Sequence, residues 1–155
     1  MTDCASDIMV RDFDSIDSNA PVEEAIKKIM AGKLRQTGYK TISLMVINEL
    51  QQLVGVITMF DILYNLRPGF LNYDLGGNAV PWKEILEPAR RELKGKLVKQ
   101  IMSQDVVTAD PDDHVMALLD RMVKNKYRRL PVVKNGRLEG VVYVGDIFHY
   151  LFNRA

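Results

Sequence analysis

The hydrophobic positions of the chain repeat. Two segments, 22–30 and 115–123, carry apolar residues at the same spacings of i, i+3, i+4, i+7 and i+8. This spacing gathers the apolar side chains on one face of a helix, so each segment is predicted to be an amphipathic helix. The two stripes are Val22, Ala25, Ile26, Ile29 and Met30, and Val115, Leu118, Leu119, Met122 and Val123. An offset of 93 residues relates them and also relates Met9 to Met102, which indicates an internal duplication.

A hairpin and a shorter helix are predicted after each of these helices. Here the offset falls from 93 to 85 residues, the separation of Asp61 from Asp146. The first copy therefore has eight more residues between its helix and its hairpin. They lie near AGKLRQTGYKT, where we expect a longer loop. In the second copy two apolar runs flank Asn135-Gly136, which is typical of a type I′ turn with positive φ at both residues. The short helices are indicated by Ile62, Leu63 and Leu66, and by Ile147, Phe148 and Leu151.

Each copy is therefore predicted to run strand, helix, strand, strand, helix. We place the first copy at residues 1–66, a connecting segment at 67–98 and the second copy at 99–155. A half of about sixty residues is marginal alone. We therefore expect an α/β (α+β) fold in which two pseudo-symmetric β-α-β-β-α halves pack through their sheets into one module. Within the connection we expect helical turns that Pro88 kinks or interrupts.

Composition and charge narrow the class of protein. The chain has 155 residues, 47% of them hydrophobic and 26% charged, with a net charge of +1, as in an ordinary globular domain. No apolar run approaches the roughly 20 residues that span a bilayer, and the N-terminus lacks the apolar region of a signal peptide. The single cysteine, Cys4, excludes an internal disulfide, and we expect it in a frayed terminus. A cytoplasmic protein without a membrane partner is expected.

The hairpins carry a recognisable signature. Gly55–Asp61 (GVITMFD) and Gly140–Asp146 (GVVYVGD) resemble the G-h-x-h-[S/T]-x-x-D signature of CBS domains, in which h is apolar. Both copies are in register and cover most of the chain outside the connection, so the chain resembles a tandem CBS pair, or Bateman module. The resemblance implies a regulatory module without enzymatic activity. It implies an adenosine-containing ligand (AMP, ADP, ATP or S-adenosylmethionine) in the cleft between motifs, and control of an enzyme, channel or transporter.

The signature contains residues suited to a ribose. A carboxylate can accept hydrogen bonds from two adjacent hydroxyls, and Asp61 lies at a predicted junction between strand and helix, as does Asp146 in the second copy. Thr58 can hydrogen-bond a ribose or a phosphate, and the helix start that follows favours an anion. The alternative role for each aspartate is that of a helix N-cap.

A basic run precedes the last hairpin. The resemblance implies that a basic residue at this place reaches the phosphates of a ligand held by the other motif, which indicates Arg128 or Arg129. Strand alternation points the two side chains to opposite faces, so we expect only one, with Arg129 as first choice, to face the cleft. Thr108 resembles a first-strand position that lines the cleft. The alternatives are a solvated basic face for the arginines and turn chemistry near Asp110-Pro111 for Thr108.

The two predicted sites are unequal. Tyr143 occupies the position of Thr58, and the first copy has Ile42-Ser43-Leu44 where the second has its arginines. We therefore predict one tight site, formed by Thr58, Asp61 and Arg129, and a second site at Asp146 that is empty or weaker. The apolar stripes exceed what one small pair can cover, and Bateman modules commonly pair through their helices, so a two-fold homodimer is expected.

Two other functions remain open on the sequence alone. The chain could be an interaction or dimerisation module that binds no small ligand. It could bind nucleic acid through Lys124–Arg129, with Tyr127 as a stacking ring, although the near-neutral net charge disfavours this. His114 and His149 are far apart and no metal-binding or nucleophile–base spacing is present, so neither a metal, a cofactor nor catalysis is expected.

Overall fold

A computed structural model describes residues 2–34, 40–41, 43–68 and 80–153 of the chain. It confirms the mixed α/β architecture built from two similar halves. The first half contains β1 (Ser15–Asp17), α2 (Val22–Ala31), β4 (Ser43–Ile47), β5 (Leu53–Thr58) and α3 (Met59–Leu66). The second contains α6 (Val115–Asn125), β6 (Arg129–Lys134), β7 (Arg137–Tyr143) and α7 (Val144–Phe152). Across the described residues, no helix has both the length and the apolar character that crossing a membrane requires.

The remaining elements precede or join the halves. They are α1 (Ala5–Ile8), β2 (Lys33–Leu34), β3 (Lys40–Thr41), α4 (Trp82–Gly95) and α5 (Val98–Ile101). The predicted long loop contains β2 and β3, which pair as an antiparallel ladder; residues 35–39 and 42 lie outside the described residues. Pro88 lies inside α4 and does not interrupt it, so that part of the expectation is wrong. The helix packs against α2 and α3 and buries Leu93, which offsets the hydrogen bond that proline removes.

The two sheets differ in the first strand. In the first half β1 runs parallel to β4, and β4 pairs antiparallel with β5. In the second half only β6 and β7 form a ladder, and the expected first strand is reduced to one parallel bridge between Ala109 and Val132. The predicted turn between β6 and β7 is confirmed, because Asn135 and Gly136 both have positive φ, 53° and 81°.

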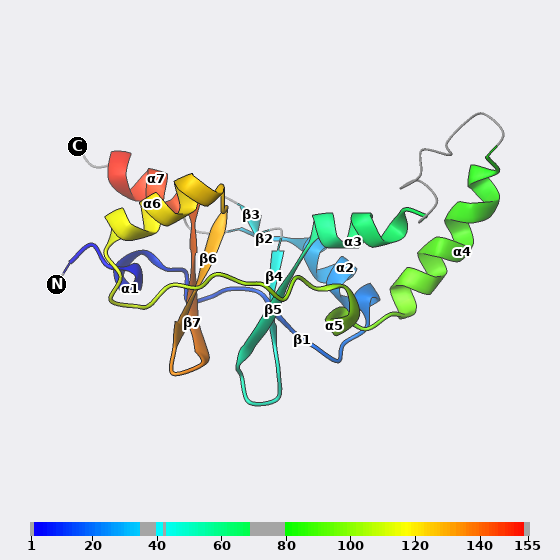
Figure 1. The fold of residues 1–155 in the computed structure, drawn as a ribbon, viewed down its shortest axis with the longest axis horizontal. Helices are drawn as coiled ribbons and strands as arrows, with labels where there is room; N and C mark the ends of the chain where they lie inside the picture. The colour runs from blue at the N-terminus through cyan, green and yellow to red at the C-terminus, as the bar shows by residue number, and fades with distance from the viewer. Residues whose placement is uncertain (1, 35–39, 42, 69–79, 154–155) are drawn as a thin grey trace.

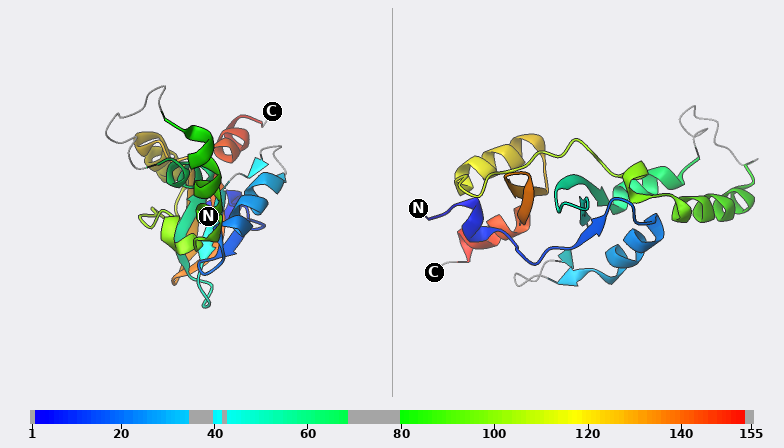
Figure 2. Two further views of the ribbon diagram at one scale, coloured as in Figure 1. Left: turned by 90° about the vertical axis from the view of Figure 1, so that its right-hand side faces the viewer. Right: turned by 90° about the horizontal axis from the view of Figure 1, so that it is seen from below.

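The two hairpins lie side by side in the middle of the molecule. Their turns point to one edge, while α3, α6 and α7 lie along the opposite edge, and both termini lie at the end away from α4 (Figure 1). Seen from below, α3 and α6 flank the strands on one side and α2 and α7 on the other (Figure 2). A helix from each half therefore lies on either side of the paired hairpins, as a pseudo-two-fold arrangement requires.

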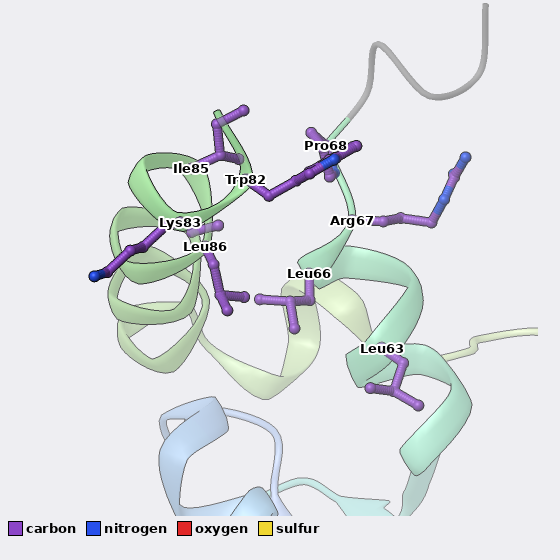
Figure 3. Close-up of a pocket in the computed structure, with 9 residues that line it drawn as sticks. Leu63, Leu66, Arg67, Pro68, Trp82, Lys83, Ile85 and Leu86 are labelled. Atoms are coloured by element: carbon purple, nitrogen blue, oxygen red, sulfur yellow. The ribbon is translucent and has the colours of Figure 1, made fainter. Parts of the chain in front are cut away.

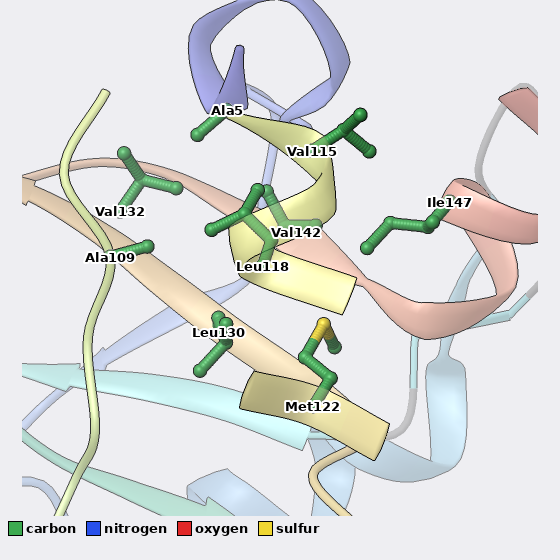
Figure 4. Packing of buried hydrophobic residues seen from close by; sticks show 9 residues of the cluster. All are labelled: Ala5, Ala109, Val115, Leu118, Met122, Leu130, Val132, Val142 and Ile147. Atoms are coloured by element: carbon green, nitrogen blue, oxygen red, sulfur yellow. The ribbon is translucent and has the colours of Figure 1, made fainter. Parts of the chain in front are cut away.

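Each half has its own apolar core, to which the predicted helix stripes contribute. Figure 4 shows the second core, where Leu118 and Met122 of α6 pack against Leu130 and Ile147. The last residue of each stripe, Met30 or Val123, is exposed. A third cluster joins the halves across the hairpins. Its buried members are Met45, Val56, Val141 and Tyr143.

The segment that precedes β1 in the first copy, and the matching segment of the second copy, each pack on the opposite half. The N–H of Val98 donates to the carbonyl of Ala20 at 2.8 Å, and the corresponding bond 93 residues away joins Ala5 to Asp113, also at 2.8 Å. Helix α5 therefore belongs to the core of the first half and α1 to that of the second. The expectation of a frayed terminus at Cys4 is wrong, because this residue is buried by the exchange. The predicted boundaries at 66 and 98 stay predictions.

The glycine that opens each signature lies where these exchanged segments cross the hairpins. A Cβ on Gly55 would lie 2.6 Å from Sδ of Met102 and 2.9 Å from the carbonyl oxygen of Ser103. A Cβ on Gly140 would lie 2.7 Å from Sδ of Met9. Neither position has room for a side chain, so a glycine lets the crossing segment hydrogen-bond to β5 or β7.

Candidate functional site

The start of α3 fixes two of the predicted site residues. Thr58 is the N-cap, and its Oγ1 accepts a hydrogen bond from the N–H of Asp61 at 3.2 Å. In return, Oδ2 of Asp61 accepts from the N–H and the Oγ1 hydroxyl of Thr58, at 2.9 and 3.1 Å. Asp61 is therefore the third residue of a capping box and not the N-cap itself. The box holds its carboxylate in a defined orientation.

The second oxygen of this carboxylate has a partner that the sequence did not single out. Oδ1 of Asp61 accepts a hydrogen bond from the hydroxyl of Ser103 at 3.0 Å. The backbone of Ser103 pairs with that of Val56, with N–O distances of 2.9 and 3.0 Å, which brings the start of the second copy beside β5. Comparison of the two copies could have pointed to Ser103, because the matching residue of the first copy, Val10, has no hydroxyl.

Arg129, the first residue of β6, comes to this site from the other half. It is only half-buried, yet burial lowers the pKa of its guanidinium. The neighbouring charge of Arg128 lowers this pKa further, while Tyr143 and Asp61 act in the opposite direction. The lowered pKa means that the folded protein disfavours this charge relative to water. An anion placed beside Arg129 would relieve that cost.

Two adjoining cavities bring these residues together. The smaller, of about 140 Å³, has apolar walls from Val56, Val106, Val107 and Pro131. Its polar lining residues are Thr58, Ser103, Asp105 and Arg129, beside the ring of Tyr127. The larger, of about 430 Å³, shares Thr58, Tyr127 and Arg129 with it. Asp61 lies behind this lining, hydrogen-bonded to Thr58 and Ser103. An apolar recess next to a basic one suits a ligand with a flat ring and an anionic tail.

The other predicted residues are not all at these cavities. Arg128 lines only the larger one, beside Arg129. We expected strand alternation to point only one of the two arginines into the cleft, but both line this cavity. Arg128 precedes the first residue of β6, so the alternation of side chains along the strand does not apply to it. Thr108 lines neither cavity, and Val106 and Val107 lie there instead. Asp146 is buried in the first turn of α7, in the second half.

The pseudo-symmetric place on the other side has different chemistry. Tyr143 pairs with Arg129 across β6 and β7, just as Thr58 pairs with Ser43 across β4 and β5. Ser43 is thus the counterpart of Arg129, and its buried hydroxyl has no hydrogen-bond partner among the described residues. Tyr143 caps α7 without a side-chain cap bond and packs into the cluster between the halves. This side therefore has the ring of Tyr143 in place of the Thr58 hydroxyl, and the hydroxyl of Ser43 in place of the Arg129 cation.

A further cavity, of about 470 Å³, lies between α3 and α4. Leu63, Leu66 and Leu86 line it, and the charged ends of Arg67 and Lys83 point away from it (Figure 3). An apolar groove without convergent polar groups does not suit a nucleotide. The candidate site is therefore the pair of cavities at Thr58 and Arg129.

Comparison with known proteins identifies the family. The family model named CBS domain matches residues 5–68 and 98–153, and each matched segment includes one of the two signatures. The chain belongs to the CBS-domain family. Its two matched segments make it a tandem CBS pair, or Bateman module, as the resemblance of the two signatures implied.

Relatives and solved structures agree with this assignment. The uncharacterized protein MJ1426 of Methanocaldococcus jannaschii is 32% identical over 121 residues, which cover 68% of this chain and 70% of the relative. The uncharacterized protein MK0525 of Methanopyrus kandleri is 30% identical, with 84% of this chain covered. The chain spans only 55% of that protein's length.

Two solved structures share the fold at lower identity. CBSX2 in complex with AMP is 21% identical, with a TM-score of 0.70 and 97% of each chain covered. MJ1225 of Methanocaldococcus jannaschii, proposed as an archaeal homologue of g-AMPK, is 24% identical, with a TM-score of 0.72. This similarity covers 96% of the chain described here and 48% of MJ1225. At these identities the likeness establishes the fold.

Proposed function

We propose that this Bateman module is a regulatory sensor that binds an adenosine-containing ligand, AMP, ADP, ATP or S-adenosylmethionine, at the two joined cavities. One observation carries the proposal. Thr58, whose hydroxyl donates to the carboxylate of Asp61, and the partly desolvated cation of Arg129, from opposite motifs, line the same cavity. A carboxylate and a cation from opposite motifs suit the two polar ends of a nucleotide, its ribose hydroxyls and its phosphate.

The cavity pair suggests how such a ligand lies. The adenine ring occupies the smaller, apolar cavity between Val106 and Tyr127, where a flat ring can stack. The phosphate lies at Arg129 and at the N-terminal end of α3, whose first turn favours negative charge. The ribose then lies against Ser103 and the carboxylate of Asp61. Thr108 and Asp146 lie outside this arrangement.

Ser103 must move for the ribose to reach its acceptor. A carboxylate offers about four lone-pair sites. Three of those on Asp61 are taken, two by Thr58 and one by the Ser103 hydroxyl. Two ribose hydroxyls therefore require Ser103 to release Oδ1. Ligand binding thus breaks a hydrogen bond between α3 and the start of the second motif, and this change can transmit ligand occupancy from one motif to the other.

The regulatory role follows from the same chemistry. The hydroxyl of Thr58 donates to Asp61 and accepts from its N–H, so Thr58 is engaged in the capping box and is not poised as a nucleophile. The AMP complex of CBSX2, whose fold this chain shares, supports an adenine nucleotide as the ligand. We propose that the module acts in the cytoplasm on a separate enzyme or transporter.

We also propose a homodimer, formed through α3 and α7. Both helices leave large apolar side chains exposed, and a water-exposed apolar face of this kind favours association. These residues are Met59, Phe60, Leu63, Tyr64, Val144, Phe148 and Phe152. Analytical ultracentrifugation at tens of micromolar protein should give twice the chain mass of 17.6 kDa. A mass of one chain would contradict the dimer.

Paired alanine variants test the ligand site. Asp61→Ala and Asp146→Ala remove the same carboxylate, at the third helical position, from the two motifs. Calorimetric titration with AMP should show one site per chain in the wild type. Asp61→Ala should lower the affinity for AMP by about ten- to hundredfold, as expected for the loss of a hydrogen bond to a charged group. Asp146→Ala should leave the affinity within about twofold.

An arginine pair completes this experiment. Arg129→Ala should lower the affinity for AMP but leave that for adenosine unchanged, because the partner of Arg129 is the phosphate. Arg91→Ala, on the outer face of α4, is the matched control. Unchanged AMP affinity in Asp61→Ala, or equal losses of adenosine and AMP in Arg129→Ala, would contradict the arrangement. If neither adenosine, AMP, ADP, ATP nor S-adenosylmethionine bound the wild type, the module would serve interaction alone.

A further inference from the structure

The larger cavity is built for more negative charge than one phosphate carries. Among the described residues that line it, Lys126, Arg128 and Arg129 are cations and none is an acid. In the proposed arrangement a single phosphate, with a charge near −2, is bound by Arg129 and the start of α3, where the two cavities meet. Lys126 and Arg128 line only the part of the cavity beyond that boundary.

Among the described residues, these two cations also have no ion-pair partner of opposite charge. Lys124, two residues before Lys126, pairs with Asp120 on the outer face of α6, with an Nζ–Oδ2 distance of 3.3 Å. Within the part of the chain that the structure describes, no such ion pair is found for Lys126 or Arg128. The positive charge of Arg128 lowers the pKa of Arg129. The chain therefore keeps like charges together around an open cavity.

The backbone at Lys126 is a second, independent observation. This residue ends α6 in the left-handed conformation, with φ 56° and ψ 36°. Glycine is the residue that helix ends of this type favour, because a Cβ is strained there. The sequence places a lysine at this strained position, and its side chain lines the cavity. Strain of this kind is retained where a side chain has a task.

From these observations we infer that the ligand of this site is a nucleoside di- or triphosphate, whose outer phosphates bind Lys126 and Arg128. The inference rests on the proposed nucleotide site and names its substrate class. The first phosphate lies at Arg129, and the following ones extend away from the apolar cavity along the basic wall. Each contact there is charge-assisted, and together they favour ADP and ATP over AMP.

The variant Lys126→Gly tests the inference by two measurements, because thermal stability should rise while the preference for ADP and ATP should fall. It removes the cation and also the backbone strain. The ligand-free variant should melt higher, by roughly 2–4 °C. Calorimetric titration in the presence of EDTA should show the wild type binding ADP and ATP about tenfold more tightly than AMP. In Lys126→Gly, which keeps Arg128, this preference should fall to about threefold or less, with a much smaller change in AMP affinity. Lys124→Gln, which removes a paired lysine nearby, should retain the preference.

The possible results separate the two proposals. Equal affinity for AMP and ATP in the wild type, or a full preference for ATP in Lys126→Gly, would overturn the inference and leave the adenosine site standing. Inorganic tripolyphosphate should bind much more weakly than ATP. If it bound as tightly, the basic wall would be a general polyanion surface and the inference would also be overturned. Failure of adenosine and all three nucleotides to bind would instead remove the proposed function, and the inference with it.

Discussion

The two pseudo-symmetric sides of the hairpin pair share a backbone frame but carry different chemistry. On the side of α3 and α6, Thr58 faces an open cavity with Arg129, and Ser103 donates to Asp61. On the side of α2 and α7, Tyr143 fills the position of Thr58 and packs between the halves. Ser43 replaces the arginine there. Duplication thus repeated the frame, while a few side chains determine whether that frame holds a cavity or a core.

The comparison teaches which parts of the repeat are structural. The features present on both sides are the glycine, the crossing segment and the aspartate in the first turn of a helix. These features belong to the backbone frame that both sides share. The hydroxyl at Ser103 and the cation at Arg129 occur on one side only, and both lie at the cavity. Residues that break the repeat therefore mark the candidate site better than residues that keep it.

The largest effect is expected from making the second side resemble the first. Tyr143→Thr removes a buried ring from the cluster with Met45, Val56 and Val141, so it should cost about 3 kcal/mol of stability through the cavity it leaves. Thermal or urea unfolding measures this loss. Calorimetry on the same sample should show any new nucleotide site to be weaker than the first, because Ser43 supplies no charge. A loss below 1 kcal/mol would mean that the ring is not part of the core.

The two signature glycines provide an intermediate test. Gly55→Ala and Gly140→Ala each force a Cβ against a methionine sulfur at 2.6 and 2.7 Å, so each should destabilise the protein by about 1–3 kcal/mol. Only Gly55→Ala also pushes on Ser103, whose hydroxyl bonds to Asp61. It alone should therefore change AMP affinity. Chemical denaturation and calorimetry of both variants measure the two effects, and equal changes in affinity would contradict the one-sided site.

The smallest effect is expected at Ser103. Ser103→Ala removes one exposed hydrogen bond and should cost about 0.5–1.5 kcal/mol of stability at most. It also frees Oδ1 of Asp61, so AMP should bind slightly more tightly, by about two- to fivefold. Val10→Ala at the matching position of the other side should not alter AMP affinity. Weaker binding to Ser103→Ala would show that the serine contacts the ligand directly and does not compete with it.

Much of the fold follows from the sequence because it depends on neighbours along the chain. The helices at 22–30 and 115–123 follow from the spacing of their apolar residues, and the turn at Asn135-Gly136 follows from the φ angles that this pair tolerates. The signature and the basic run also put Thr58, Asp61 and Arg129 forward as one site. Their role in binding a nucleotide stays a prediction, although the structure places Thr58 and Arg129 at one cavity.

Other features depend on contacts between distant segments, which only the tertiary structure decides. The sequence alone did not reveal that α1 packs on the second half, or that Ser103 bonds to Asp61, 42 residues away along the chain. Pro88 remains inside a helix because packing against α2 and α3 outweighs its local cost. Likewise Val106 and Val107 line the cavity in place of Thr108 because the path of the crossing segment sets which residues face it. Local propensity determines the elements, and the partners that each element meets determine the site.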